Sequence, residues 1–452
     1  MKSFDVLLVG SGSGLEVSSE AAQRGLSVAV VEQGPFGGTC LNRGCIPSKM
    51  LIHCADVAET IRGSHLFGIK ATVESVDWQF IIKRVVDEVD GDAHAVEAGN
   101  RENPNITVYK GQGRFVGEKT LEVNGEQIRG ETVVIAAGSR PYIPEIPGLI
   151  DLPYITSDEA LRLPEQPRRL AIVGGGYIAA EMAHFFGSMG TEVTIIHRGP
   201  RLLGEEDEQV AQRFTEVYQR KFNLLLDAHI SWTHRRGGEF VVEVSVNGHQ
   251  ETVAADALLL ATGRVPNTDL LEVANTGVKI DSLGFVETDE YLQTSVPGVW
   301  SLGDIVGKYL LKHSANLEAA YVAYNIFNPD HRAAVNYHAM PHAIFASPQV
   351  AGVGLTEQEA KEQGILYKVA TYDYRDTAYG SSIEDKDGFV KVLAQPETAE
   401  ILGCHIIGTD ASILIQEVVN AMRMRLTTDA ITQSIYVHPA MPEVVQRAFG
   451  AL

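Results

Sequence analysis

A strand, a glycine-rich loop, a helix and a second strand occur in this order twice in the chain, and this repeat constrains the fold more than any other feature. The first copy begins with the apolar run FDVLLV at Phe4, passes through GSGSG and ends in LSVAVVE, whose last residue is Glu32. The second copy, residues 168–203, reads RRLAIVGGGYIAAEMAHFFGSMGTEVTIIHRGPRLL. This pattern is typical of a dinucleotide-binding fold. The two copies predict two dinucleotide sites, which suggests two ligands that exchange electrons.

The glycines of the first copy fit a phosphate-binding loop. Gly10 permits the tight turn, and Gly12 lets the backbone approach a pyrophosphate, while the following helix offers free N–H groups and the positive end of its dipole. Gly14 lies in the same loop and is a further candidate contact. Glu32 is placed to accept a hydrogen bond from a ribose hydroxyl. Leu15 stands where a third glycine is usual, so the pattern does not assure close helix-to-strand packing there.

The second copy differs from the first at the acid position. Gly174, Gly176 and Ala179 occupy the fingerprint positions, but the second strand ends in His197 followed by Arg198. A carboxylate there would repel a 2′-phosphate, whereas a guanidinium would pair with it. We therefore expect NADPH, rather than NADH, at this site.

Two further stretches occur in step with the two copies. VVIAAGSRPYIPEIPG (133–148) and LLLATGRVPNTD (258–269) are both apolar runs that end in a small-residue turn with Arg and Pro. We interpret them as the points where the chain leaves each nucleotide fold. Gly138 and Gly263 in their turns are candidate cofactor contacts.

Two of the four cysteines lie close together in the stretch GGTCLNRGCIPSKM (37–50). Five residues of regular helix rise about 7.5 Å, and a disulfide needs its Cα atoms within roughly 7 Å. Cys40 and Cys45 therefore cannot share one regular helix if they are bonded, and Gly44 lets the chain turn between them. Pro47 suits a first helical turn. This predicts that Cys45 lies near a helix N-terminus, where the dipole favours a thiolate.

The alternatives for this pair are a zinc site and plain buried thiols. Zinc takes about four ligands, and Cys54 and Cys404 stand alone without a second close pair. A redox-active pair is the favoured interpretation, and we expect no metal.

Length and charge bound the remaining possibilities. A chain of 452 residues predicts two to four domains. The formal charge is −21 and no block of Lys and Arg occurs, so nucleic acid and anionic membranes are poor partners. The apolar runs are too short for a signal-peptide core or a membrane span. We expect a cytoplasmic protein.

The segment HPAMPE (438–443) offers a base and a carboxylate. Glu443 lies five residues after His438 and could orient the imidazole and raise its basicity. Taken alone, a His-Pro pair near a C-terminus is more often a surface turn.

The cysteine segment resembles the redox-active segment of the FAD-dependent pyridine nucleotide-disulfide oxidoreductases, and the resemblance covers essentially the whole chain. GVWSLGDI (298–305) resembles the second FAD motif of this family, IFASPQVAGVGLTEQEA (344–360) the start of its dimerisation domain, and HPAMPE its catalytic His-Pro segment. The implied fold is α/β and glutathione reductase-like, with two Rossmann-like domains and an α+β C-terminal dimerisation domain. The implied division is 1–150 and 270–335 for the FAD site, 151–269 for NAD(P)H and 336–452 for dimerisation.

The resemblance also implies roles for single residues. Cys40 would attack the substrate disulfide and Cys45 would remain beside the flavin, while His438, oriented by Glu443, would protonate the leaving thiol from the other subunit of an obligate homodimer. The implied cofactor contacts are Thr39, Lys49 near the reactive edge of the flavin, Glu181 as its ion-pair partner, Tyr177 as the aromatic gate over the flavin, and Asp304 on the ribityl chain.

The substrate is left open by these features. The arginine after the second strand and the stretches KYLLKHSANLEA and DTAYGSSIED resemble the mycothione-reducing members, whereas NRGCIPSK also occurs in dihydrolipoamide dehydrogenases. We favour reduction of a small mycothione-like disulfide by NADPH through FAD and the Cys40–Cys45 disulfide. An NAD-dependent dihydrolipoamide dehydrogenase is the first alternative, and a non-catalytic flavoprotein binding subunit is the second.

Overall fold

The computed structural model describes residues 1–452, which form two compact units. Unit 1 comprises Met1–Met50, Phe80–Tyr142 and Gly263–Tyr337. Unit 2 comprises Leu51–Gln79, Ile143–Thr262 and His338–Leu452. The predicted division near residues 150, 269 and 335 stays a prediction, while the chain passes between the units after residues 142, 262 and 337. The grouping of residues 51–79 with unit 2 has no counterpart in that division.

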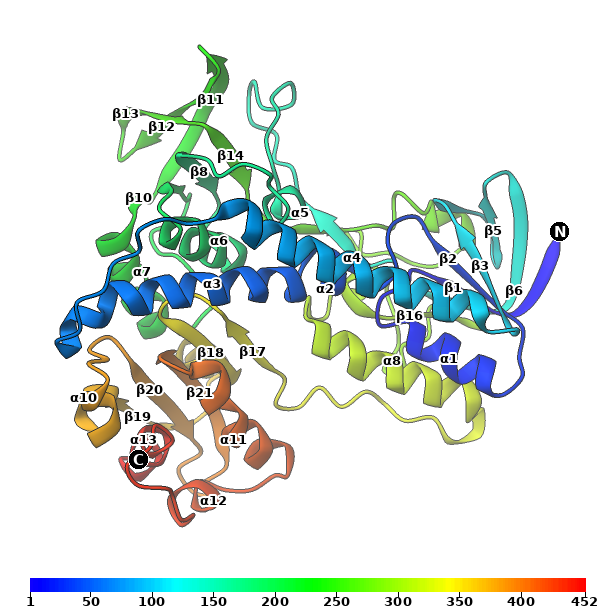
Figure 1. Ribbon diagram of the computed structural model, residues 1–452. Helices are drawn as coiled ribbons and strands as arrows, with labels where there is room; N and C mark the ends of the chain where they lie inside the picture. The colour runs from blue at the N-terminus through cyan, green and yellow to red at the C-terminus, as the bar shows by residue number, and fades with distance from the viewer. The chain divides into compact units, whose positions relative to one another are not determined.

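Unit 1 is built on a seven-stranded sheet in the order β3-β2-β1-β6-β5-β4, with β16 beside β6 (Figure 1). The parallel strands are β1 (Lys2–Val9), β2 (Val28–Glu32), β3 (Ile106–Lys110), β6 (Glu126–Ile135) and β16 (Val299–Ser301). The antiparallel strands are β4 (Gly113–Gly117) and β5 (Thr120–Val123). The valine- and leucine-rich ends of β1 and β2 are buried on both faces, as central parallel strands require.

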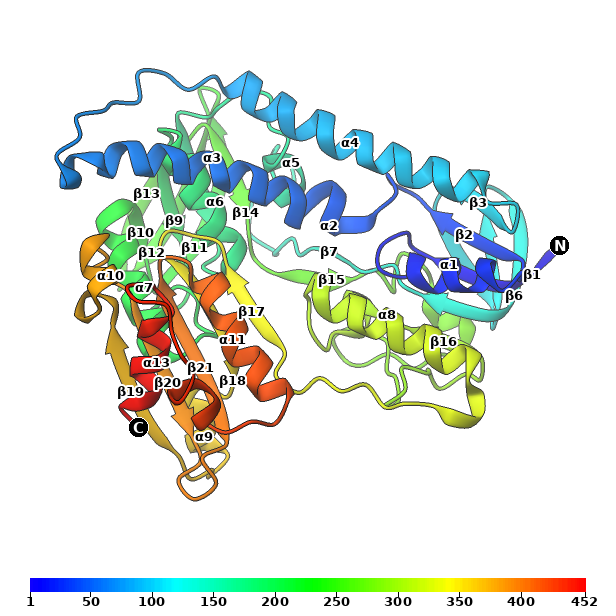
Figure 2. The same ribbon diagram turned by 60° about the horizontal axis from the view of Figure 1, so that its bottom comes forward.

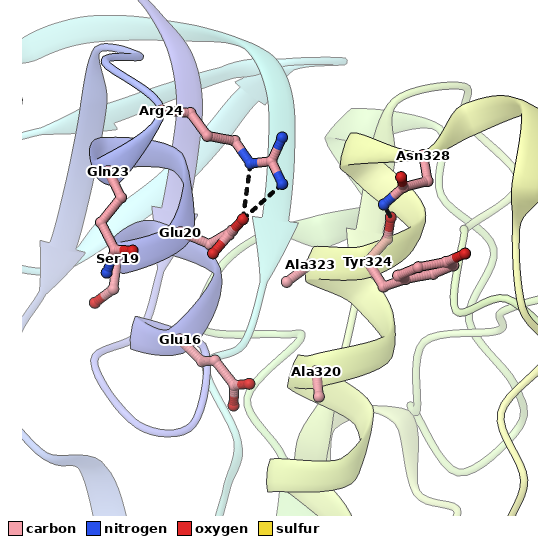
Figure 3. Close-up of a pocket in the computed structure, with 9 residues that line it drawn as sticks. All are labelled: Glu16, Ser19, Glu20, Gln23, Arg24, Ala320, Ala323, Tyr324 and Asn328. Carbon is pink, nitrogen blue, oxygen red and sulfur yellow. Dashed lines mark hydrogen bonds and ion pairs between the residues drawn. The ribbon is translucent and has the colours of Figure 1, made fainter.

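Helices α1 (Leu15–Gln23) and α8 (Lys312–Phe327) lie side by side in unit 1, and both views show this (Figures 1 and 2). Small side chains line their contact and join the core of the sheet, which includes Val17, Ala21, Ala319, Val322, Ala323, Val6 and Leu8. Farther out, the two helices leave a groove in which Arg24 is paired with Glu20 (Figure 3).

Helix α4 and three 3-10 helices join the cysteine segment in unit 1, which ends at Met50 within α3 and resumes at Phe80 within α4. Helix α2 (Gly38–Arg43) is followed by α3 (Cys45–Gly63), and α4 (Trp78–Glu102) leads into β3. The 3-10 helices are η2 (Val273–Thr276), η3 (Gly303–Val306) and η4 (Pro329–His331). Strands β7 (Ser139–Pro141) and β15 (Arg264–Pro266) pair with each other in an antiparallel two-stranded sheet. The two stretches interpreted as exits from the nucleotide folds are therefore neighbours.

Unit 2 repeats the strand, loop, helix and strand pattern. A parallel sheet has the order β10-β9-β8-β14, with β8 (Arg169–Val173), α6 (Tyr177–Ser188) and β9 (Glu192–Ile196) corresponding to β1, α1 and β2. The other elements here are β10 (Asn223–Leu225), β14 (Ala257–Leu260), α5 (Ser157–Ala160), α7 (Glu208–Lys221), η1 (Ser64–Phe67), and the antiparallel sheet of β11 (Ala228–Arg236), β12 (Glu239–Val246) and β13 (His249–Ala255).

The C-terminal part of unit 2 is an antiparallel sheet in the order β17-β18-β21-β20-β19, covered by helices (Figure 1). Its strands are β17 (Pro341–Ile344), β18 (Gln349–Gly354), β19 (Lys368–Asp373), β20 (Phe389–Ala394) and β21 (Ile401–Gly408). Its helices are α9 (Glu357–Glu362), η5 (Tyr374–Asp376), α10 (Ala378–Ser382), α11 (Ala411–Arg423), α12 (Asp429–Thr432) and α13 (Glu443–Gly450). Apolar residues of α11 and α13 pack on the sheet in one core.

The predicted fold class is confirmed: two Rossmann-like α/β sheets precede an antiparallel α+β C-terminal part. None of the helices is both long enough and apolar enough to span a lipid bilayer.

Candidate active site

The two clustered cysteines lie on either side of a sharp break between helices. Cys40 is in α2, and Cys45 is the first residue of α3. Gly44 between them has φ −143° and ψ −117°, and a Cβ there would lie 2.9 Å from the carbonyl oxygen of Thr39 and 3.3 Å from the Cα of Cys40. Only a residue without a side chain fits this turn. Cys40 and Cys45 do not share one regular helix, and Cys45 lies at a helix N-terminus, as predicted.

Both cysteines are present as thiols, and their side chains are hydrogen-bonded to each other. This contact, followed by burial and the charge of Cys45, raises the pKa of the Cys40 thiol, because two neighbouring thiols cannot both ionise at low cost. The ammonium of Lys312 acts in the opposite direction and lowers the pKa of Cys40.

Asn42, which the sequence analysis did not single out, holds the loop before the first cysteine. Its Nδ2 donates to the carbonyl oxygens of Phe36 at 2.8 Å and Gly38 at 3.0 Å, and to that of Pro35 at 3.3 Å. The side chain is buried, so it bridges the start and the end of α2 away from solvent. Asn42 thereby fixes the orientation of the helix that carries Cys40.

The first glycine loop has the conformation that a phosphate-binding turn needs. Gly10 has φ +101°, and a Cβ there would lie 2.4 Å from the carbonyl oxygen of Ala136. A Cβ at Gly14 would lie 2.7 Å from Leu8 Cδ1, so Gly14 provides the close packing of helix on strand that Leu15 does not. Gly12 lies against Gly38 of α2, since a Cβ at Gly38 would be 2.8 Å from the Cα of Gly12.

Glu32 lies at the end of β2 and links the glycine loop to the segment before the cysteines. Its Oε2 accepts the backbone N–H of Ser11 at 2.9 Å and the Ser11 hydroxyl at 2.8 Å, and its Oε1 accepts the N–H of Gly34 at 2.7 Å. The carboxylate is thus fixed at the carboxyl end of β2, where the sequence predicts a ribose. Whether it binds one stays a prediction.

Asp304, at the second position of η3, lies beside the exit strands. Its Oδ2 accepts the hydroxyl of Ser139 at 2.6 Å, and Arg264 Nε lies 3.8 Å away. Behind it, Oε2 of Glu318 accepts the N–H of Gly303 at 2.6 Å. These contacts hold the turn that presents Asp304.

Glu318 is a buried carboxyl group that sequence reasoning missed. Its Oε1 accepts the hydroxyl of Tyr337 at 2.8 Å, and its side chain is fully buried. Burial raises the pKa of Glu318 to about 6, although the hydrogen bonds from Gly303 and Tyr337 oppose this.

The turns that contain Gly138 and Gly263 are neighbours in unit 1. Both glycines have positive φ, +65° and +111°. The carbonyl oxygen of Gly138 accepts the N–H of Asn267 at 3.1 Å, and that of Gly263 accepts the N–H of Tyr142 at 2.9 Å. A Cβ at either glycine would meet no atom within 4 Å, so both turns border open space.

In unit 2, the second glycine loop has His197 directly beside it. Gly174 has φ +125°, and a Cβ at Gly175 would lie 2.5 Å from the imidazole of His197. A Cβ at Gly176 would meet no atom within 4 Å. Burial, and then the charge of Arg198, lower the pKa of His197, so the imidazole is neutral near pH 7. Arg198 itself is exposed.

The other predicted contacts are distributed between the two units. Tyr177 begins α6 and is 44% exposed, so its ring is accessible. Glu181, on the same helix, is buried, and its Oε1 accepts the N–H of Phe345 at 2.9 Å. Lys49 lies on α3, about one helical turn after Cys45. The ion pair expected between Lys49 and Glu181 stays a prediction.

His438 and Glu443 are in contact in the C-terminal part of unit 2. Nδ1 of His438 donates to Oε1 of Glu443 at 2.9 Å, and Oε2 accepts the N–H of Ala440 at 3.1 Å. The hydrogen bond from His438 is the main cause that lowers the pKa of Glu443. With Nδ1 bonded to a carboxylate, Nε2 is the nitrogen available for proton transfer. The His438 side chain is 70% exposed and lies free for such a step.

These residues fit a bound dinucleotide in unit 1. The tight glycine turn, the start of α1, Glu32 and Asp304 lie at the carboxyl ends of adjacent parallel strands β1, β2, β6 and β16, where α/β sheets bind ligands. The open turn at Gly138 directly follows β6 at the same end of the sheet.

Comparison with known proteins gives the same assignment. Residues 4–325 match the family model described as pyridine nucleotide-disulphide oxidoreductase, and residues 340–449 match its dimerisation domain. The chain is 41% identical over 465 residues to mycothione reductase of Mycobacterium tuberculosis, covering 100% of both. It is 34% identical to dihydrolipoyl dehydrogenase of Cupriavidus necator, covering 99% of this chain and 97% of the relative.

A solved structure agrees over the full length. The HOCl-induced flavoprotein disulfide reductase RclA from Escherichia coli superposes with a TM-score of 0.88 at 28% identity, covering 99% of each chain. The chain therefore belongs to the pyridine nucleotide-disulphide oxidoreductase family and is an FAD-dependent flavoprotein disulfide reductase whose redox-active pair is Cys40 and Cys45.

Proposed function

We propose that this enzyme uses NADPH to reduce a low-molecular-weight, mycothione-like disulfide. The observation that carries the proposal is the hydrogen-bonded Cys40–Cys45 pair at the break between α2 and α3. Full-length similarity to a mycothione reductase supports the substrate class. The division into FAD, NAD(P)H, central and dimerisation segments, with boundaries near 150, 269 and 335, is part of the proposal.

The cysteines exchange electrons with the substrate through a mixed disulfide. Bound FAD supplies the two-electron relay from the nicotinamide to the cysteine pair. The thiolate of Cys40 attacks one sulfur of the substrate, and the substrate sulfur–sulfur bond breaks as the new bond forms. Cys45 then attacks Cys40, which releases the second substrate thiol and restores the Cys40–Cys45 bond. Two electrons and two protons are consumed for each substrate disulfide.

His438 supplies a proton to the first leaving thiolate, and we propose that it acts across a homodimer. The match to a dimerisation domain supports a homodimer. Ile435 and Val437, on the same segment as His438, are 101% and 78% exposed, which a second copy of the chain would relieve. In this arrangement His438 of the partner subunit, oriented by its own glutamate, reaches the cysteine pair.

The remaining predicted residues bind the two nucleotides. The glycine loop of Gly10, Gly12 and Gly14, with Glu32, takes the ADP part of FAD. The other parts of FAD are contacted by Thr39, Lys49, Gly138, Gly263 and Asp304. The NADPH site is proposed to consist of Gly174, Gly176, Tyr177, His197 and Arg198, and Glu181 keeps its proposed role as the ion-pair partner of Lys49.

Arg198 is proposed to select the 2′-phosphate of NADPH. It is exposed at the end of β9, whereas Arg201, three residues on, is held in an ion pair with Glu208 at 2.8 Å. We expect Arg198→Gln to raise KM for NADPH about tenfold or more, with little change for NADH, because a charge-assisted contact is lost. Arg201→Gln is the matched control. Equal effects of the two substitutions would contradict the assignment.

The substrate is tested by comparing rates on mycothiol, glutathione, bacillithiol, coenzyme A and lipoamide disulfides, each with NADPH and NADH. We expect the highest kcat/KM with mycothiol disulfide and NADPH, and no turnover after Cys40→Ser. The second candidate is an NAD-dependent dihydrolipoyl dehydrogenase, because such enzymes match 98–99% of the chain at 34–35% identity. Dominant activity with lipoamide and NAD would establish it in place of the first.

A further inference from the structure

The segment that carries His438, residues 434–440, lacks the backbone hydrogen bonds that a helix or strand would give it. It joins α12 to α13 in the C-terminal part of unit 2 (Figure 1). Ile435, Tyr436 and Val437 lie in no helix or strand, and no backbone hydrogen bond involves them. Side chains must therefore hold the segment in place.

Tyr436 is the inward-facing residue of this segment. Its two neighbours, Ile435 and Val437, are exposed, whereas the Tyr436 ring packs against the core that the sheet shares with α11. The Tyr436 hydroxyl donates to Oε2 of Glu417 on α11 at 2.7 Å. This is the one hydrogen bond that joins residues 435–437 to another element, and it lies two residues before His438.

Glu417 is a fixed acceptor for this hydrogen bond. It lies on α11 between Leu414 and Val418, both of which are buried in the core of the C-terminal sheet. Its second oxygen, Oε1, is buried and has no hydrogen-bond partner. Burial raises the pKa of the Glu417 carboxyl, and the hydrogen bond from Tyr436 opposes this. Tyr436 is thus the one hydrogen-bond donor to this carboxyl group.

The stability of the fold does not explain the pair. A phenylalanine at position 436 would bury the same ring, and an apolar residue at position 417 would avoid a buried oxygen without a partner, which is unfavourable. The pair adds direction instead, because a hydrogen bond to a carboxyl oxygen restricts the position of its donor more narrowly than apolar packing does.

The other side-chain hydrogen bonds to the segment come from α13. Nε2 of Gln446 donates to the carbonyl oxygen of Ser434 at 3.2 Å, and Glu443 accepts from Nδ1 of His438 at 2.9 Å. Both of these partners belong to one helix, so only the Tyr436 hydroxyl bonds the segment to α11. The imidazole is therefore held from two helices rather than one.

We propose that Tyr436 is a positioning residue for the proton donor, which through Glu417 holds the segment so that Nε2 of His438 stays aimed at the leaving sulfur. The proposal rests on the proposed function, in which His438 protonates the first leaving thiolate. The Tyr436 hydroxyl acts through His438 and takes no part in the proton transfer itself. It therefore affects release of an aliphatic thiolate, which needs a proton, and leaves hydride transfer from NADPH to FAD unaffected.

The test separates the two half-reactions of the holoenzyme by anaerobic stopped-flow absorbance. One is flavin reduction by NADPH, and the other is reoxidation of the two-electron-reduced enzyme by the best aliphatic disulfide of the substrate comparison. Tyr436→Phe should slow reoxidation about tenfold, a part of the factor of about 10²–10⁴ that a positioned proton donor contributes, and leave flavin reduction unchanged. Glu417→Leu should slow reoxidation similarly. Glu417→Gln, whose amide oxygen accepts the same hydroxyl, should restore most of that rate.

A second tyrosine provides the matched control. The hydroxyl of Tyr367 donates to Glu357 at 2.9 Å in the same part of unit 2, outside the His438 segment. Tyr367→Phe should leave reoxidation unchanged. In the His438→Ala background, Tyr436→Phe should have no further effect, since a residue that acts only through His438 then has nothing to position.

Wild-type reoxidation by Tyr436→Phe would overturn the proposal. Equal slowing by Tyr436→Phe with and without His438 would also overturn it, because the hydroxyl would then serve the fold alone. Failure of the proposed function is recognised separately. It would appear as His438→Ala enzyme that is reoxidised at the wild-type rate.

Discussion

A buried ion cluster in unit 2 allows a stringent test of the energetics. Nζ of Lys391, on β20, lies 2.9 Å from Asp207 and 2.8 Å from Glu357, with Lys391 1% and Asp207 0% exposed. Lys361 pairs with the same Glu357 at 2.9 Å but is 64% exposed. Lysine-to-methionine substitutions at the two positions therefore remove the same charge from one carboxylate, once in the interior and once at the surface.

The expected effects differ because the two sites differ in solvation. Removing one partner of a buried pair costs about 3–5 kcal/mol. Asp207 keeps two backbone donors, the N–H of Gln209 at 3.0 Å and that of Glu357 at 3.2 Å, which places Lys391→Met near the lower end, about 3 kcal/mol. Lys361→Met should change the free energy of unfolding little, because solvent screens an exposed i,i+4 pair.

Native-state hydrogen exchange of the β20 and β21 amides measures both effects. A loss of about 3 kcal/mol accelerates exchange through opening of unit 2 by about a hundredfold, and the control substitution by about twofold. The hydrogen bond from Lys391 is the main cause that lowers the pKa of Glu357 to about 2. This stabilisation is complete above the usual pKa of 4.5 and is lost as the pH falls toward about 2. The free energy of opening should therefore fall less steeply with decreasing pH in Lys391→Met than in the wild type. Equal protection in the two variants would refute the reasoning.

Three further predictions concern the site. The wild type should lose about 2 kcal/mol of unfolding free energy as the pH rises from about 4.5 past about 6, since the folded state holds the Glu318 proton more tightly than the unfolded state does. Glu318→Gln should abolish this loss. A pH dependence of urea unfolding that equals that of the wild type would contradict it. Glu443→Gln should lower kcat and shift the pH profile of kcat, because Nδ1–H of His438 then donates to a neutral amide oxygen instead of a carboxylate; a drop in kcat without a profile shift would count against this role. Asn42→Ala should lower the local unfolding free energy of residues 34–44 by about 1–3 kcal/mol and so make this segment more susceptible to proteolysis than in the wild type, with FAD bound in both. Equal cleavage rates would contradict this.

The parts of the fold that were predictable are those that local sequence encodes. The two glycine loops follow apolar runs that bury both faces of a parallel strand, so strand, turn and helix are all readable in order. The break between Cys40 and Cys45 was predictable because a regular helix cannot accommodate a bond between them and Gly44 permits the turn. Helix-to-strand packing at the first glycine loop differs from the expectation at Leu15, because Gly14, one residue earlier, provides the close approach.

Contacts between distant segments could not be predicted. Ser13 and Lys312 are 299 positions apart, and no pattern in either segment predicts the hydrogen bond between them. Asn42 is a common polar residue in the short helix α2, and its role depends on three carbonyl oxygens that point at it only after folding. By its sequence context Glu318 is an ordinary helical residue. Its pKa is raised only because α8 is buried against η3 in the folded structure.

The most direct test of the account is an anaerobic titration with reduced nicotinamide, followed by the flavin spectrum. The wild-type enzyme should take up four electrons per FAD-containing protomer in two stages, because Cys40 and Cys45 accept two of them, and Cys45→Ser should take up only two. Uptake of two electrons by the wild-type enzyme would show that the cysteine pair is not coupled to the flavin and would contradict the central claim.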